Sequence, residues 1–246
     1  VNAEYTIDNS PGSSRMARTS ASDKWGNDVT YNRPLASELD EIKDFLSEKF
    51  GYNPGRYQGY SLKTPDYKLL ARLDWNINDN NKLNVRFSHT HNYYSTSPSS
   101  SMSPIGGTNN KFKAPDGTDI AFNRYSAGRQ SVYAQYFESA RYYQEQNFTS
   151  VAAELNSRLF NGRGNNLLRF TWSHQDEPRS FEGNVFPTVD ILSNKEVSGS
   201  DTSAIFTTFG VDPFTYGNLR DVQTLIGTDE LTLNSGIHNV IAGTQA

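Results

Sequence analysis

Residues 69–87 read LLARLDWNINDNNKLNVRF and form two alternating segments around a short polar turn. The odd-numbered residues of 69–77 and 83–87 are all apolar, and most of the residues between them are polar. Such period-two alternation over about ten residues, with aromatic residues near the ends, is typical of transmembrane β-barrel strands. Strands of soluble β-proteins usually alternate for only about five or six residues. The stretch therefore predicts a β-hairpin of an antiparallel transmembrane barrel.

The overall composition permits several classes of protein. Of the 246 residues, 35% are hydrophobic, the mean hydropathy is −0.69, and there are 14 Tyr and 14 Phe. A loop-rich soluble β-protein, a partly disordered chain and a barrel with a polar interior would all fit these values. The net charge of −4 without a basic stretch gives no indication of a nucleic-acid partner. The absence of cysteine excludes disulfides and thiolate metal sites.

Ordered and irregular segments alternate along the chain, and each predicted hairpin has a short turn. We expect an all-β chain of about six strands with one short loop helix. A transmembrane helix is not expected, because no run of about 18 apolar residues exists. Six segments are predicted in chain order: an extracellular loop at 1–66 with a helix at 37–50, a hairpin at 67–94, a long loop at 95–130, a hairpin at 131–175, a long loop at 176–220 and a truncated hairpin at 221–246. Residues 1–34 are predicted to be loop throughout.

The one predicted helix has an apolar stripe and a clear stop. Gly51 follows the last stripe residue and is suited to a helix C-terminus. Two interpretations stay open, namely packing of the helix onto a loop or sheet rim and a docking surface for another protein. The stripe consists of Leu35, Leu39, Ile42, Phe45, Leu46 and Phe50.

Short turns and long loops alternate in the way expected of outer-membrane barrels, which have tight periplasmic turns and long extracellular loops. About six strands cannot close, since roughly eight make the narrowest filled barrel. The segment is therefore expected to be an arc of a larger barrel. We also expect an internal piece of a longer protein, because residues 1–4 show neither an initiator Met nor a signal sequence and the last strand stops at Ala246.

Several of these segments resemble one family. Residues 69–78 and 81–87, the preceding FGYNPGRY at 50–57 and the closing DELTLNSGIHNVIAG at 229–243 resemble Oar-like TonB-dependent outer-membrane receptors. The resemblance implies a plugged barrel of roughly 22 strands in the cell outer membrane. It also implies that external loops capture a nutrient, that TonB acts through a plug region absent from this chain, and that a surface lipoprotein is a possible partner. The imported substrate is unknown.

The candidate metal ligands have simpler explanations. His89 and His91 share one strand face at a spacing that can chelate zinc, but no third ligand is apparent. They continue an apolar face toward Tyr93, which fits an interfacial girdle of amphipathic rings. Asp74 to Asp79 resembles the start of a calcium loop, but glycine at position six and glutamate at position twelve are missing. We predict no metal site and no cofactor.

Catalytic and binding residues are equally hard to assign. The pairs Asp40-Glu41 and Asp176-Glu177 are read as solvated carboxylates, since sequence neighbours on a strand point apart. No nucleophile motif is present, so an enzyme is not expected. Asn147 begins a glycosylation pattern of the kind that is common by chance. Loop aromatics either grip a ligand or pack the loops together, and they are Phe112, Phe122, Tyr125, Phe181, Phe186, Phe209, Phe214 and Tyr216.

Two other functions compete with the receptor. One is a soluble extracellular all-β module that binds glycan or protein, and the other is a passive porin without a plug. The apolar face that carries Leu73 and Trp75 distinguishes the soluble module from a barrel. A second sheet or a helix packed over that face would refute the barrel.

Overall fold

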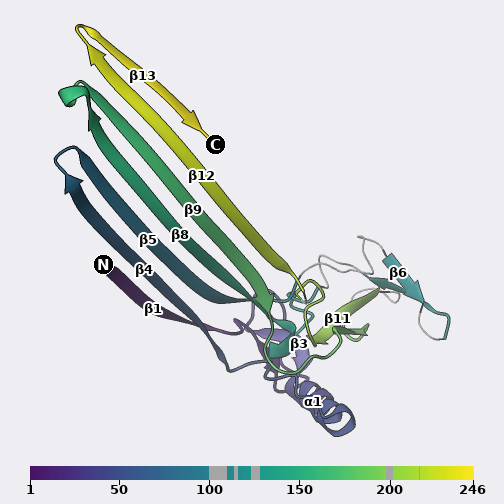
Figure 1. Cartoon of the computed structure of the whole chain (residues 1–246). Helices are drawn as coiled ribbons and strands as arrows, with labels where there is room; N and C mark the ends of the chain where they lie inside the picture. Colours follow the sequence, from purple (N-terminus) through teal and green to yellow (C-terminus); the bar gives the residue numbers. More distant parts are fainter. Residues whose placement is uncertain (100–109, 114–115, 123–127, 198–201, 216) are drawn as a thin grey trace.

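A computed structural model describes residues 1–99, 110–113, 116–122, 128–197, 202–215 and 217–246. The chain is mostly β, with one large antiparallel sheet and one short α-helix. Among the described residues this sheet has seven strands, and the two outermost, β1 and β13, each pair with one neighbour only (Figure 1). In spatial order the strands are β1 (Asn2–Pro11), β4 (Ser61–Asn78), β5 (Asn81–Thr96), β8 (Tyr142–Leu159), β9 (Gly164–Ser180), β12 (Leu219–Ser235) and β13 (His238–Gln245).

The prediction that residues 1–34 form a loop is wrong. β1 pairs with β4 from Asn2 opposite Leu70 to Pro11 opposite Ser61, which gives seven strands where about six were expected. The sequence gives only a weak strand signal here, because the apolar face consists of Ala3, Tyr5 and Ile7 in an otherwise polar segment. Pairing with a long neighbouring strand supplies its backbone hydrogen bonds and outweighs this weak local preference. Further along, β2 (Met16–Arg18) and β3 (Tyr31–Leu35) form a small parallel pair.

Each of the three predicted hairpins has the short turn expected of it. In the first, the Asn78 side-chain oxygen accepts hydrogen bonds from the backbone N–H groups of Asn80 and Asn81 at 3.0 and 2.9 Å, a common way for asparagine to stabilise a turn. A 3₁₀ turn, Phe160–Gly162, joins β8 to β9. Gly236, with φ of +62°, lies between β12 and β13.

The strand ends differ from the predicted hairpin limits. β4 begins at Ser61, before the predicted start at 67, and β8 begins at Tyr142, after the predicted start at 131. A 3₁₀ turn, Glu138–Ala140, occupies part of the residues between. Strands β4 and β8 are each 18 residues long, far beyond the five or six usual in soluble sheets.

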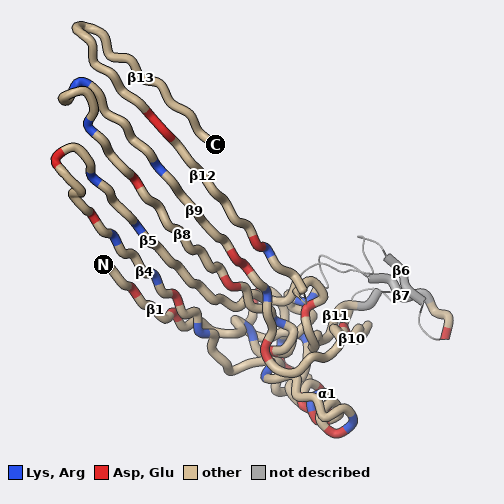
Figure 2. Tube along the Cα trace, viewed as in Figure 1, with Lys and Arg blue, Asp and Glu red and all other residues tan. Residues whose placement is uncertain are grey.

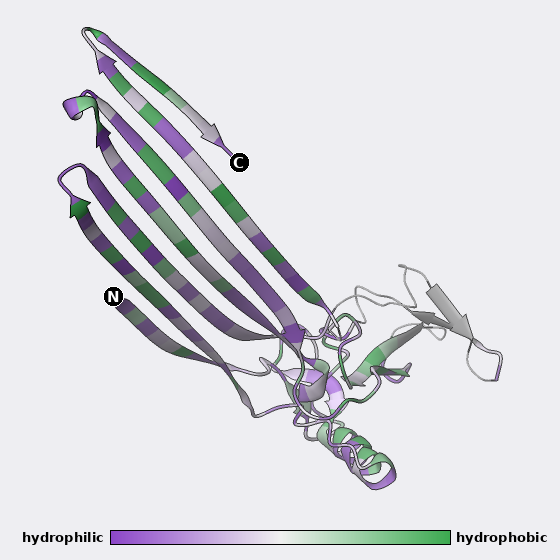
Figure 3. Cartoon of the chain, viewed as in Figure 1, coloured by the Kyte–Doolittle hydropathy of each residue, from purple (hydrophilic) through white to green (hydrophobic). Residues whose placement is uncertain are grey.

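Cross-strand register gives the sheet one apolar and one polar face. Figure 3 shows hydrophobic and hydrophilic residues alternating along the strands, and Figure 2 shows charges spaced along the same strands. The central row of the apolar face consists of Leu73, Val85, Ala153, Phe170 and Gly227. The adjacent row, on the opposite face, consists of Asp74, Asn84, Glu154, Arg169 and Thr228. The predicted alternation therefore extends across five strands.

The long connections leave one end of the sheet and fold together, opposite the three short turns (Figure 1). We call the described residues of 12–60, 97–141 and 181–218 the loop head. It contains α1 (Ala36–Phe50) and a four-stranded sheet in the order β10 (Val189–Ser193), β11 (Thr202–Phe209), β7 (Asp119–Phe122) and β6 (Asn110–Lys113). The prediction of irregular loops at 95–130 and 176–220 is therefore only partly right.

Helix α1 confirms the predicted helix, starting one residue earlier than expected. Gly51 ends it in the left-handed conformation, with φ of +60°, and donates its N–H to the Ser47 carbonyl at 3.0 Å. Leu39 and Leu46 of the apolar stripe are fully buried. They join a core drawn from all three connections, which consists of Ala17, Leu39, Leu46, Tyr52, Phe137, Phe206 and Phe209. The hydrophobic core therefore lies in the loop head.

Candidate functional site

The apolar face of the long sheet is uncovered in the described part of the chain. No described helix or second sheet lies over it (Figure 1). Leu73, Trp75 and Leu225 remain 65%, 57% and 62% exposed, and none belongs to a buried cluster. Large apolar side chains at such exposure over several strands mark a surface that contacts a partner protein, a ligand or a membrane.

The two histidines considered as metal ligands are hydrogen-bonded to neighbours on their own face of the sheet. His89 Nδ1 lies 2.8 Å from the Thr149 hydroxyl, and His91 is hydrogen-bonded to Asn147. The Tyr67 ring stacks on His91 with centroids 4.7 Å apart. Together these side chains form two adjacent polar–aromatic rows on the apolar face, on the side of the loop head. Within the described ranges, no three His, Cys, Asp or Glu residues gather in a metal-binding group.

The acidic candidates are dispersed. Asp74, from the predicted calcium-like segment, accepts hydrogen bonds from Arg72 on the same strand at 2.7–3.0 Å. Asp40 accepts one from the Tyr57 hydroxyl at 2.9 Å. Asp176 and Glu177 are neighbours on β9 and therefore point to opposite faces. The structure brings neither acidic pair into a convergent arrangement.

A buried arginine organises the loop head. Arg33 is 1% exposed. It lies in the first of the three connections that make up the loop head (12–60) and contacts the second (97–141) and the third (181–218). It donates to five backbone carbonyls at 2.8–3.3 Å, those of Tyr133, Ser193, Lys195, Ala204 and Ile205. Burial lowers the pKa of its guanidinium to about 10. A planar guanidinium with five donors is suited to joining carbonyls from separate segments.

Two ion pairs connect the same segments. Arg18 Nη2 lies 2.5 Å from Glu196 Oε2, joining the first connection to the third. Arg129 Nη2 lies 2.7 Å from Asp190 Oδ2, joining the second to the third. Both arginine side chains are almost fully buried, where a charge is tolerated only when it is paired. The loop head is therefore held by polar contacts across its three parts as well as by its core.

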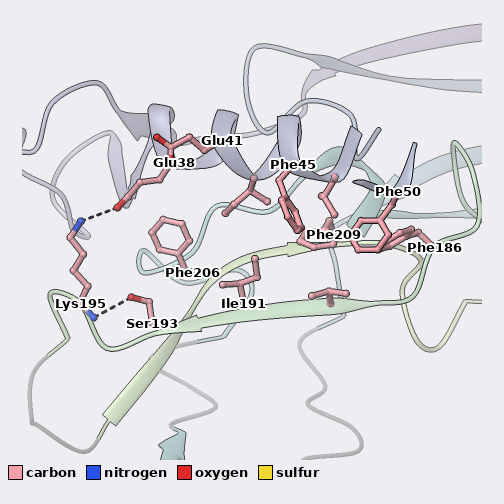
Figure 4. Close-up of a pocket in the computed structure, with 13 residues that line it drawn as sticks. Glu38, Glu41, Phe45, Phe50, Phe186, Ile191, Ser193, Lys195, Phe206 and Phe209 are labelled. Carbon is pink, nitrogen blue, oxygen red and sulfur yellow. Dashed lines mark hydrogen bonds and ion pairs between the residues drawn. The ribbon is translucent and has the colours of Figure 1, made fainter. Parts of the chain in front are cut away.

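A groove lies between α1 and the ribbon formed by β10 and β11 (Figure 4). Its volume is about 600 Å³, within the range of small-molecule sites. The apolar lining consists of Ile42, Phe45, Leu46, Phe50, Phe186, Val189, Ile191, Phe206 and Phe209. Phe50 contacts Phe45 and Phe186 edge-on, each with centroids 5.9 Å apart, and Phe186 stacks on Tyr52 at 4.1 Å.

Charged groups line one end of the groove. Lys195 Nζ lies 2.8 Å from Glu38 Oε1, and Glu38 also accepts a hydrogen bond from the Leu35 backbone N–H at 3.2 Å. Burial raises the pKa of Glu38, but the hydrogen bonds from Lys195 and Leu35 outweigh it and hold that pKa below its usual value. Glu41, one helical turn further on, is exposed at the same end.

Only some of the candidate loop aromatics line the groove. Phe186 and Phe209 line the groove, whereas Phe181 and Phe214 do not. The side chains of Phe112, Phe122, Tyr125 and Tyr216 lie outside the described residues. Phe45 and Phe50 also line the groove. The sequence pattern gives no sign of this role, although both residues belong to the predicted apolar stripe of the helix. They are 52% and 60% exposed, so the stripe serves both the core and the groove.

Comparison of the chain with protein-family models, with curated proteins and with solved structures finds no match. Among the described residues, no helix has both the length and the apolar character needed to cross a bilayer.

Proposed function

We propose that this chain is part of a TonB-dependent receptor of the cell outer membrane, which captures a nutrient and imports it. The observation that carries the proposal is the seven-stranded antiparallel sheet with a bare apolar face, a polar opposite face and all long connections at one end. Transmembrane barrels combine these three features. The receptor subgroup is supported by the resemblance of residues 69–87 and 229–243 to Oar-like receptors.

The apolar face would contact lipid. From Leu69 to Trp75 on β4, four apolar residues point to this face, and Ile77 follows where the pairing with β5 becomes irregular. The eight residue steps from Leu69 to Ile77 span about 26 Å of strand. A barrel strand tilted by about 45° needs about 9–11 residues to cross the hydrocarbon core of the bilayer. The Tyr67–His91 row, and His89 opposite Leu69 in the next row, then lie at the edge of the apolar band, where amphipathic rings favour the interface.

The open edges of the sheet require further strands. β1 and β13 each leave one backbone edge without a partner among the described residues. Unpaired N–H and C=O groups cannot face hydrocarbon, because each would cost several kcal/mol. The proposal therefore places this sheet as an arc of a closed barrel of roughly 22 strands, with a plug inside and the loop head outside the cell.

Two measurements on the full-length protein test the proposal. Recovery in the outer-membrane fraction and faster gel migration before boiling than after it are expected of a closed barrel, whose hydrogen-bond ladder resists SDS. Soluble protein without a heat-dependent shift would reject the barrel and favour the soluble binding module.

Binding of a purified TonB C-terminal domain separates the receptor from a passive porin. A receptor is expected to retain this domain through its TonB-binding segment. A heat-shifting protein that does not bind it would favour the porin.

A further inference from the structure

The groove of the loop head has the form of a ligand site. It is bounded on two sides, by α1 and by the β10–β11 ribbon, and side chains from both elements point into it (Figure 4). Phe45 and Phe50 stay more than half exposed there although they lie beside a buried core. Exposed rings that already form the wall of a groove of about 600 Å³ indicate a small-molecule site more than a flat protein interface.

The aromatic lining favours a ring-bearing ligand. Phe45, Phe50, Phe186 and Phe209 form a continuous chain of ring contacts, with successive centroids 5.9, 5.9 and 6.0 Å apart. A planar apolar ligand can stack on these rings or meet them edge-on, and each such contact adds about 0.5–1.5 kcal/mol beyond burial.

The charges at the groove end favour a cation. Lys195 is already paired with Glu38, whereas no described cation pairs with Glu41. The three charged residues of the lining, Glu38, Glu41 and Lys195, therefore carry a net charge of −1 (two acidic, one basic). The faces of phenyl rings also attract cations. An anionic ligand would be disfavoured by both Glu41 and the rings.

We propose that this groove binds a small aromatic cation, with its ring against Phe45 and Phe50 and its cationic group beside Glu41. The inference adds a ligand class to the proposed receptor function. Binding itself depends only on the loop head, so it can be tested separately from the barrel.

The test compares tryptamine with indole-3-propionate, which share the indole ring and differ in the sign of their charge. Each is titrated onto the full-length protein, in phosphatidylcholine nanodiscs with empty nanodiscs in parallel if the protein is recovered with membranes, and in buffer if it is recovered in soluble form. Binding is followed by saturation-transfer NMR. Tryptamine is expected to bind about fivefold more tightly, which corresponds to one partly exposed ion pair.

Two variants identify the contacts. Glu41→Gln is expected to abolish the preference for tryptamine, while Glu48→Gln, on the same helix outside the groove, leaves it unchanged. Phe45→Ala is expected to weaken both probes about tenfold. Phe160→Ala serves as its control, because Phe160 is also more than half exposed and lies in the turn at the other end of the sheet.

Equal binding of the two probes, no binding of tryptamine, or an unchanged preference in Glu41→Gln would overturn the proposal. Binding of an apolar peptide but not of tryptamine would overturn it as well and assign the groove to a protein partner. The heat-shift assay on the same preparation separates the two proposals. Tryptamine binding without a heat shift would reject only the barrel, and a heat shift without tryptamine binding would reject only the ligand class.

Discussion

Replacement of Leu73 by arginine is the sharpest test of what surrounds the apolar face. Leu73 is 65% exposed in the described structure, so in water the substitution would change the free energy of unfolding by no more than about 0.5 kcal/mol. In lipid the result depends on depth. Leu73 lies four residues from both Leu69 and Ile77 on β4, about 13 Å of strand on each side, which places it at the middle of the apolar band.

Arginine at the midplane of a barrel's lipid face costs about 2–4 kcal/mol. That range lowers the ratio of folded to unfolded protein by about 30-fold to 900-fold. The control is Leu70→Arg. Leu70 lies three residues before Leu73 on the same strand and points to the polar face. Leu70 lies in a row with Ser88, Ser150 and Ser173, where we expect a cost below about 1 kcal/mol because water can reach the new charge.

The assay is urea-induced unfolding of the full-length protein in phosphatidylcholine vesicles, followed by tryptophan fluorescence and by the unheated gel band. If the apolar face contacts lipid, the midpoint urea concentration should shift strongly for Leu73→Arg and only slightly for Leu70→Arg. Equal shifts in the two variants, or a cost below about 0.5 kcal/mol for Leu73→Arg, would show that the apolar face does not contact lipid.

Three further predictions concern the loop head. Arg33→Met removes the shared donor of five carbonyls, of which those of Ala204 and Ile205 belong to fully buried residues, so the loop head should become protease-sensitive. The exposed control Arg56→Met should stay resistant, and equal resistance of both variants would contradict this. Gly210→Ala should lower the melting temperature of the loop head more than Gly183→Ala does. Both glycines have positive φ, but only at Gly210 would a Cβ lie 2.0 Å from a backbone carbonyl oxygen. Similar melting temperatures of the two variants would refute this prediction. Burial, aided by a neighbouring carboxylate, raises the pKa of Tyr57 from 10.0 to about 12, so its contribution to stability is present below pH 10 and lost as the pH rises through about 12. Tyr57→Phe should flatten that part of the pH–stability curve, and an unchanged curve would reject the assignment.

The sequence alone was sufficient for the hairpins and for the helix. The alternation of residues 69–87 fixes which side chains share a face, because successive strand residues point to opposite sides. The Asn78 turn and the Gly51 helix stop depend on side chains and backbone angles within a few residues. These features are local, and local chemistry is what a single sequence shows directly.

Pairing and assembly of distant segments could be seen only in the tertiary structure. β1 has a weak pattern of its own and is a strand because it pairs with β4, some 60 residues away. Arg33 reaches carbonyls 100 to 172 residues further along the chain. The groove combines the exposed edge of the α1 stripe, Phe45 and Phe50, with residues of the third connection. Such contacts depend on how long loops close on one another, and their energies come from burial and hydrogen bonding between segments that no local pattern relates.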